Sequence, residues 1–239
     1  MISGSIQPVI LHDLNGARAE AYKPAVAVAM RVVSEWYAAE LGRPFKAIES
    51  TIALQAVNSR LYLSNPLEAL AQTVEATGLP NFGNGFMPYI YVGFFVGLGG
   101  FAGTVHWDRQ AGLIGLSDAC LTAISGDQQA CLNIIGGSPM RCSVSGQHGA
   151  IAHELMHALG WGEHTDTPGL DLSSAEYQEF PNCHLPDVVK AHILRPPWNI
   201  FLGDLVSPVS ILEQVKGIEA AIMRLRIQLE QGGDSSYPP

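Results

Sequence analysis

The sequence predicts an α+β fold, in which a twisted mixed sheet is backed by one helix and flanked by a second helix with a polar centre. Two observations carry this prediction. Helix-like and strand-like segments alternate over much of the chain, as they do in sheets covered by helices. Residues 88–96 are almost all aromatic or β-branched, which is typical of a buried strand. With 239 residues, 47% of them hydrophobic, the chain can bury a core of its own.

The first part of the chain is punctuated by prolines and glycines. Residues 1–23 are expected to be irregular. Pro24 is placed to open a helix that runs to about residue 41, where Gly42 ends it. Residues 45–57 alternate loosely between apolar and polar side chains and predict a strand.

Asn65-Pro66 is a helix-start signal, because Asn caps a helix and Pro suits its first turn. From this point onward we expect a helix over 65–77, the apolar strand 88–96, a short strand at 112–116, a helix over about 146–160, and a short helix around 187–194.

The C-terminal segment shows a different pattern. Apolar residues from Ile211 to Leu229 recur at alternating spacings of four and three, which predicts a heptad-patterned helix over 208–231. This helix either packs on the preceding domain, expected over residues 1–207, or associates with another copy of the chain. Residues 232–239 are expected to be a disordered tail.

The charge balance excludes several classes of partner. The formal net charge is −9, from 13 Lys and Arg against 22 Asp and Glu. Nucleic acids and anionic membranes need clustered Lys and Arg, so neither is expected as a partner. Residues 86–105 are uncharged and long enough to cross a bilayer, but their many glycines favour a strand and loop. We therefore expect no integral membrane span.

The cysteines bear on the cellular compartment. Four cysteines are present, and they can form two disulfides in three alternative pairings: Cys120, Cys131, Cys142 and Cys183. The pairing considered first is Cys120–Cys131, which closes a short loop, together with Cys142–Cys183; four free thiols are the alternative. The N-terminal residues lack the apolar region of a signal peptide. We expect an extracellular or periplasmic protein whose export signal has been removed, or else a cytoplasmic one.

One segment carries a metal-binding pattern. His153 and His157 are four residues apart, so a helix places both on one face, where each can direct a ring nitrogen at the same metal ion. Glu154 can reach a water molecule on that ion. Burying these groups without partners would be costly, and a metal removes the cost. Imidazole ligands suit Zn²⁺. The alternative is a pair of ordinary helical histidines.

With Gly160, this segment resembles the metzincin family of zinc endopeptidases, whose motif is His-Glu-x-x-His-x-x-Gly-x-x-His. The third histidine of that motif would fall at position 163, which is Glu163 here, and His164 follows one residue later. The resemblance implies a zinc ion bound by His153, His157 and His164, with Glu163 as the alternative third ligand.

The resemblance extends downstream, but the methionine of the family's pattern is absent there. The family has a turn beneath the zinc with the pattern Ser-x-Met-x-Tyr, and residues 173–177 keep this spacing with Ala175 at the methionine position. The resemblance implies that Tyr177 helps to stabilise the oxyanion. It also implies that the glycine-rich stretch with Gly99 and Gly100 lies near an edge strand and helps to bind substrate.

The function implied by the resemblance is zinc-dependent endopeptidase activity on a protein or peptide, with Glu154 as general base. Two alternatives are kept. One is a catalytically inactive, zinc-binding interaction module on the same scaffold; the other is a gluzincin-type peptidase with Glu176 or Glu179 as third ligand. Calcium is a second candidate ion, with Asp166 and Asp171 as candidate oxygen ligands.

The substrate pocket is expected beside the loop that follows the third ligand. Leu170, Leu172, Phe180 and Leu185 fall in that loop. The expected preference is therefore for an apolar or bulky side chain.

Overall fold

A five-stranded mixed sheet and seven α-helices make up the part of the chain that the computed structural model describes. That part comprises residues 5–45, 48–79, 89–100, 102–107, 111–137, 139–164, 171–194 and 201. The chain divides into two compact units, Met1–Leu202 and Gly203–Pro239, and every described residue belongs to the first. The predicted heptad helix over 208–231 and the tail 232–239 lie outside the described residues.

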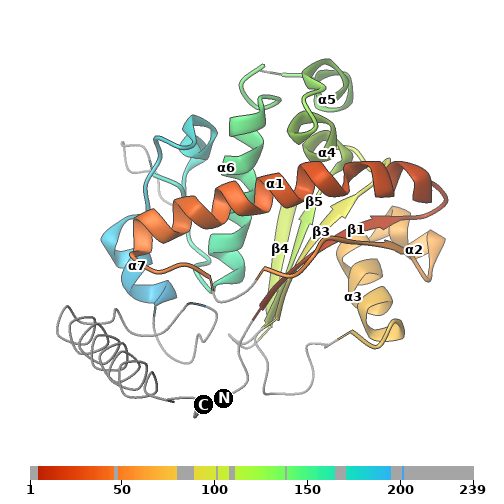
Figure 1. The fold of residues 1–239 in the computed structure, drawn as a ribbon, viewed down its shortest axis with the longest axis horizontal. Helices are drawn as coiled ribbons and strands as arrows, with labels where there is room; N and C mark the ends of the chain where they lie inside the picture. Colours follow the sequence, from red (N-terminus) through yellow and green to blue (C-terminus); the bar gives the residue numbers. More distant parts are fainter. Residues whose placement is uncertain are drawn as a thin grey trace, which may run out of the picture. The chain divides into compact units, whose positions relative to one another are not determined.

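The predicted mixed sheet is present. Four of its strands run parallel, and the fifth lies antiparallel at one edge (Figure 1). The strands are β1 (Ser5–His12), β2 (Ile52–Gln55), β3 (Tyr89–Phe95), β4 (Ala102–Trp107) and β5 (Ala111–Leu116). Their order in space is β2-β1-β3-β5-β4. Within the described part of the chain, β4 therefore pairs with β5 alone.

β1 is an interior strand, so the expectation that residues 1–23 are irregular is wrong. That expectation rested on Pro8, Asn15-Gly16 and Pro24 as chain punctuation, and proline does remove a backbone donor from a strand ladder. The ladder between β1 and β2 begins only at Val9, one residue after Pro8. Before that point, the backbone N–H of Glu49 donates to the carbonyl of Ile6 at 2.8 Å, and Gln7 donates from Nε2 to the carbonyl of Ser50 at 2.9 Å. Pro8 therefore lies between an isolated backbone contact and the start of the ladder, where its missing donor is tolerated.

α1 (Gly16–Leu41) is the longest helix and lies across one face of the sheet (Figure 1). Asn15 caps its start by accepting from the backbone N–H of Arg18, and Gly42, with φ of 65°, ends it. The prediction that Pro24 opens this helix is wrong, since Pro24 lies inside it. The helix tolerates the missing donor because it buries a long apolar face, including Val26, Ala29, Met30, Val33 and Tyr37.

Both faces of the sheet are covered by helices, and side chains of each strand alternate between two cores. On β1, Ile6 and Ile10 belong to the larger core, whereas Val9 and Leu11 belong to the smaller one. The larger core lies under α1, α4 (Asp118–Ile124) and α6 (Val144–Ala158). The smaller core lies under α2 (Ser59–Ser64) and α3 (Pro66–Ala76). α2, α4, β4 and α5 (Gln128–Ile135) were not predicted from the sequence.

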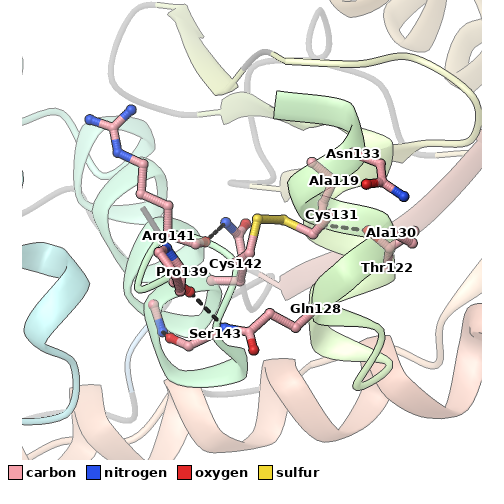
Figure 2. Close-up of a disulfide and its surroundings, with 12 residues drawn as sticks. Ala119, Thr122, Gln128, Ala130, Cys131, Asn133, Pro139, Arg141, Cys142 and Ser143 are labelled. Atoms are coloured by element: carbon pink, nitrogen blue, oxygen red, sulfur yellow. Dashed lines mark hydrogen bonds between the residues drawn. A yellow bond between two sulfur atoms is a disulfide. The ribbon is translucent and has the colours of Figure 1, made fainter. Parts of the chain in front are cut away.

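The disulfide links Cys131 in α5 to Cys142 just before α6 (Figure 2). The predicted pairing of Cys120 with Cys131 is therefore wrong, and Cys120 and Cys183 are free and buried. The faces of α4 explain the difference. Cys120 points into the larger core, whereas Cys131 and Cys142 meet in a small separate cluster over Ala119 and Ala123. Burial raises the pKa of the Cys183 thiol to about 12, so it stays protonated.

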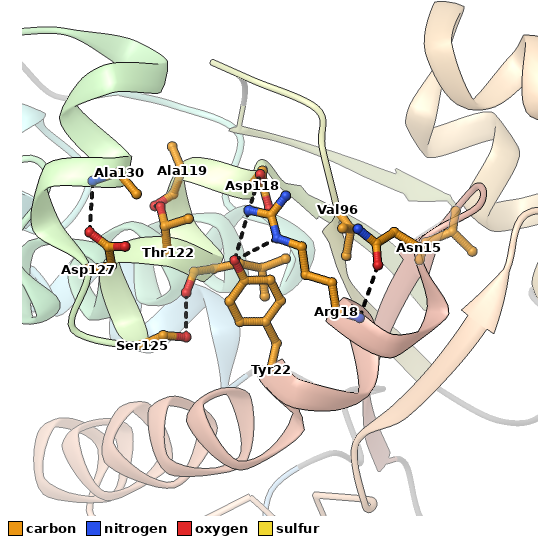
Figure 3. Close-up of polar contacts among 12 residues, drawn as sticks. Asn15, Arg18, Tyr22, Val96, Asp118, Ala119, Thr122, Ser125, Asp127 and Ala130 are labelled. Carbon is orange, nitrogen blue, oxygen red and sulfur yellow. Dashed lines mark hydrogen bonds and ion pairs between the residues drawn. The ribbon is translucent and has the colours of Figure 1, made fainter.

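An ion pair joins the start of α1 to the start of α4 (Figure 3). Arg18 Nη2 lies 2.8 Å from Asp118 Oδ2, and the same guanidinium donates to the hydroxyl of Tyr22 at 2.9 Å. The Asp118 side chain is only 6% exposed, against 38% for Arg18.

None of the described helices combines the length and the apolar character that crossing a membrane requires.

Candidate metal centre

Helix α6 carries the two histidines of the predicted motif. It runs from Val144 to Ala158, close to the predicted range of about 146–160. Ser143 caps its start by accepting from the backbone N–H of Gly146, at 2.9 Å. Beyond its end, Gly160 has a φ of 98°, a conformation that favours glycine and turns the chain out of the helix axis.

Three ring nitrogens converge beside α6. His157 Nε2 lies 3.0 Å from His153 Nε2 and 3.2 Å from His164 Nε2. Among the described residues, these histidines form the one group of His, Cys, Asp or Glu side chains close enough together to hold a metal ion. The extra residue before His164 does not prevent its ring from reaching the other two.

Backbone carbonyls determine which nitrogens carry protons. Nδ1 of His153 lies 2.6 Å from the carbonyl oxygen of Leu172, and Nδ1 of His157 lies 2.6 Å from that of Trp161. A carbonyl can only accept, so each Nδ1 carries a proton, and in the neutral form of each ring Nε2 carries the lone pair. Two such lone pairs that face each other at 3.0 Å repel unless a proton or a metal ion lies between them.

Two separations within the group are compatible with a tetrahedral metal ion such as zinc. Three imidazole nitrogens at roughly 2.0–2.1 Å from a tetrahedral zinc ion lie about 3.3 Å from one another. The observed separations of 3.0 and 3.2 Å from His157 are close to this value. Three protein ligands leave the fourth position of a tetrahedral site for water or substrate.

The cluster is graded from buried to open. His153 is buried, His157 is half-buried and His164 is exposed. Burial, above all, lowers the pKa of His153 to about 4; the rings of His157 and His164 act in the same direction, and the carbonyl of Leu172 opposes them. His153 is therefore neutral at physiological pH, which is the form that binds metal. The group opens to solvent at His164.

The other candidate ligands differ in position. Glu163 is exposed and Glu179 is half-buried, and neither belongs to the histidine group. Glu176 lies in the short 3-10 helix η1 (Ala175–Glu179), but its side chain lies outside the described residues. Glu154 follows His153 on α6 and is only 8% exposed, so a carboxylate lies buried next to the first histidine.

Tyr177 packs against the histidine group from η1. Its ring centroid lies 5.0 Å from that of His153. Gly149 on α6 permits this approach, because a Cβ at that position would lie 1.8 Å from the carbonyl oxygen of Tyr177. The role of Gly149 could not be predicted from the sequence, since only the packing of η1 on α6 reveals it.

The turn that follows residue 170 supports His153. Asp171 is buried, and its Oδ1 accepts from the backbone N–H and the hydroxyl of Ser173 at 2.8 and 2.9 Å. The backbone N–H of Leu172 donates to the carbonyl of His184, at 3.0 Å, which fixes the peptide whose carbonyl accepts from His153. Asp171 thus shapes this turn, and Asp166, the other candidate calcium ligand, lies outside the described residues.

A comparable support holds His157. His192, on α7 (Asp187–Ile193), contacts the carbonyl of Gly160 through Nε2 at 3.0 Å, and its ring packs edge-on against Trp161. The carbonyl of Trp161 in turn accepts from His157. Both histidine rings are therefore oriented by groups behind them, as the ligand rings of metal sites usually are.

A cavity of about 380 Å³ lies beside the histidine group. Tyr177 lines it and also contacts His153, and Gly100 lines it from the turn between β3 and β4. Gly99 approaches Ile134, since a Cβ there would lie 3.0 Å from the Ile134 side chain. The leucines and phenylalanine expected in the pocket wall, Leu172, Phe180 and Leu185, lie in the larger core instead, and Leu170 lies outside the described residues.

Comparisons with known proteins find only distant likeness. No family model and no curated protein matches the chain. The structure is similar to an archaemetzincin from Methanopyrus kandleri, with a TM-score of 0.44 and 12% identity over 80% of this chain and 93% of that one. It also resembles a chain of a chaperone–substrate complex, with a TM-score of 0.35 and 15% identity, over 72% of this chain and 25% of that one.

Proposed function

We propose that the protein is a zinc-dependent endopeptidase, with His153, His157 and His164 as the zinc ligands. The observation that supports this most directly is the convergence of three Nε2 atoms, at 3.0 and 3.2 Å from that of His157, together with the contact of Nδ1 with a backbone carbonyl in both histidines of α6. Zinc at this position would lower the pKa of a water molecule and polarise a peptide carbonyl.

Glu154 is the proposed general base. It is the residue after the first histidine and is buried, so its carboxylate can take a proton from the attacking water inside the site. The same carboxyl group then passes the proton to the leaving amine. Tyr177 is the proposed donor to the carbonyl oxygen as negative charge develops there, because its ring already lies against His153.

The outer edge of β4 is the proposed site for the substrate backbone. β4 borders no other described strand on that side, so its backbone groups can pair with an extended peptide. Gly100 precedes β4 and lines the adjacent cavity, which supports the predicted role of the glycine-rich turn. A protein or peptide in extended conformation is therefore the proposed substrate.

The first experiment measures zinc content and casein hydrolysis on the same preparation, for the unchanged protein and for Glu154→Gln. We expect about one zinc per chain in both. We expect chelator-sensitive hydrolysis in the unchanged protein and loss of nearly all turnover in the variant, because removing the general base leaves the ligands in place. Gln matches Glu in size, so the substitution removes the base without changing the size of the side chain.

Each outcome has a distinct meaning. Zinc binding without hydrolysis of casein or of any peptide in a proteome-derived library favours the inactive interaction module. Hydrolysis retained in Glu154→Gln contradicts the proposed mechanism. Absence of zinc from the unchanged protein, after purification with zinc present, contradicts the metal centre itself.

A further inference from the structure

The cavity beside the histidine group has one charged wall residue. Most of the described residues that line its 380 Å³ are apolar, small or uncharged, among them Leu116, Ile134, Ile135 and Ala150. Arg141 is the exception. In a chain with a net charge of −9, a cationic side chain stands out chemically at the wall of a cavity that no other described charged residue lines.

The backbone that carries Arg141 is held firmly. Cys142, the next residue, is fully buried and bonded to Cys131 of α5. The side-chain amide of Gln147 donates to the carbonyl of Arg141, and that of Gln128 donates to the carbonyl of Pro139 at 2.8 Å (Figure 2). Ser143 then caps α6. The position of Arg141 is therefore set by the disulfide and by the helix that carries the histidines.

The guanidinium itself remains available. Figure 2 shows the side chain extending away from the disulfide, and Arg141 is exposed. Among the described residues, no carboxylate forms an ion pair with it. A guanidinium offers five N–H donors in a planar fork that matches a carboxylate, and it stays charged at any physiological pH.

The cavity is close enough to the histidines to hold a neighbouring substrate residue. Ala150 lines the cavity three positions before His153 on α6, which is about 4.5 Å along the helix axis. Tyr177 spans the two sites. An extended peptide advances about 3.3 Å per residue, so a residue within one or two positions of a carbonyl at the histidine group reaches the cavity.

We infer that Arg141 makes the site selective for a carboxylate on the substrate, the side chain of Glu or Asp at a position next to the cleaved bond. This rests on the proposed peptidase function and names its substrate class. A carboxylate in the cavity would form a bidentate pair with Arg141, and its methylene groups would contact the apolar wall. An uncharged Gln of the same size would lose the ionic part of that interaction.

The test maps cleavage sites in a proteome-derived peptide library by mass spectrometry. We expect Glu and Asp to be enriched at one flanking position, and a matched peptide pair to show about tenfold or higher kcat/KM for Glu over Gln. Arg141→Gln should bring this ratio close to one, and Arg141→Glu should shift the preference to Lys and Arg. Arg60→Gln, an exposed arginine on α2, is the control that should keep the ratio.

A second library, amidated at its C-termini, separates the two sources of carboxylate. Acidic enrichment that survives amidation supports a side-chain carboxylate, whereas cleavage concentrated near free C-termini, lost on amidation and lost in Arg141→Gln, assigns the carboxylate to the substrate C-terminus and overturns the side-chain preference. Cleavage with no acidic enrichment, or with the same enrichment in Arg141→Gln, overturns the inference and leaves the peptidase function intact.

A measurement of peptide binding tests the inference even if the protein does not cleave peptides at all. Labelled hexapeptides with Glu or Gln at the fourth position are titrated into zinc-treated Glu154→Gln. Tighter binding of the Glu peptide, by about tenfold or more and dependent on Arg141, supports the carboxylate site without any turnover. Equal binding of both peptides overturns it.

Discussion

Two backbone carbonyls, those of Leu172 and Trp161, determine what the histidine group can bind. They place a proton on Nδ1 of His153 and of His157, and so leave Nε2 of each neutral ring as an electron-pair donor. His164 is the exposed member of the group and the proposed third ligand, so its removal tests the metal centre directly.

The first prediction compares His164→Ala with Glu163→Ala. Loss of an outer partner of a ligand already weakens metal affinity about 10–100-fold, and loss of a ligand itself should cost at least as much. We therefore expect His164→Ala to weaken zinc affinity by about 100-fold or more. The measurement is a competition titration of zinc against a chelating dye.

The matched control is the adjacent carboxylate. Glu163→Ala removes a charged side chain of the same loop and should leave zinc affinity close to that of the unchanged protein, since Glu163 lies outside the histidine group. A large loss in Glu163→Ala with little loss in His164→Ala would make the carboxylate the third ligand.

At the scale of elements, the site depends on how η1 meets α6. Gly149 lets the backbone of Tyr177 pass close to the helix, and the turn before η1 presents the Leu172 carbonyl to His153. The two elements therefore cannot separate without moving both Tyr177 and the Leu172 carbonyl that orients His153. A helix of ordinary apolar pattern thus becomes a site only through the segment packed against it.

The second prediction is that Gly149→Ala lowers the free energy of unfolding. The new methyl group would lie 1.8 Å from the Tyr177 carbonyl oxygen, so η1 has to shift. Overpacking at a buried contact costs about 1–3 kcal/mol, and a backbone atom yields less easily than a side chain. Urea unfolding followed by circular dichroism measures the change.

Gly162→Ala serves as the control for stability. A Cβ at Gly162 meets nothing within 4 Å among the described atoms, and the residue is exposed. Its unfolding midpoint should match that of the unchanged protein. If Gly149→Ala were equally stable, the close approach of η1 to α6 would not be a constraint on the fold.

At the scale of the whole molecule, contacts between distant segments join the layers around the sheet. Arg18 and Asp118 are 100 residues apart and connect the first turns of α1 and α4. α4 in turn contributes Ala119 and Cys120 to the cavity wall. The ion pair therefore links the long backing helix to an element that shapes the proposed binding site.

The third prediction is that Arg18→Met destabilises the fold more than the double variant Arg18→Met/Asp118→Asn. The single change leaves a carboxylate, 6% exposed, without its cationic partner, which costs about 1–3 kcal/mol or more. In the double variant no charge is left buried, so part of that loss is recovered. Chemical unfolding of the three proteins checks this; strictly additive losses would contradict it.

Several elements of the fold could be predicted from local sequence. The helix predicted over 65–77 is observed at Pro66–Ala76, and the strand predicted over 88–96 at Tyr89–Phe95. In both, cap residues and side-chain periodicity act within a few positions along the chain. The helix with the His153 and His157 pair was predicted for the same reason, because residues four apart share a face whatever the rest of the fold does.

The features that were missed depend on how segments pack, not on local pattern. β1 contains Pro8 and is a strand because it is flanked by β2 and β3. Cys131 bonds with Cys142, 11 residues on, because both lie in a separate small cluster, whereas Cys120 lies in the larger core. Local pattern carries no information about which of several similar faces will meet.

The sequence by itself thus determined the chemistry that the protein carries: two histidines one helical turn apart, a carboxylate beside them, and a further histidine just beyond a helix-ending glycine. Tertiary structure alone decided which carbonyls orient those rings, that Tyr177 packs on His153, and that Arg141 lines the neighbouring cavity. The physical reason is one of range. Helix periodicity and capping act over about four residues, whereas carbonyl partners and cavity walls come from segments brought together by burial of the core.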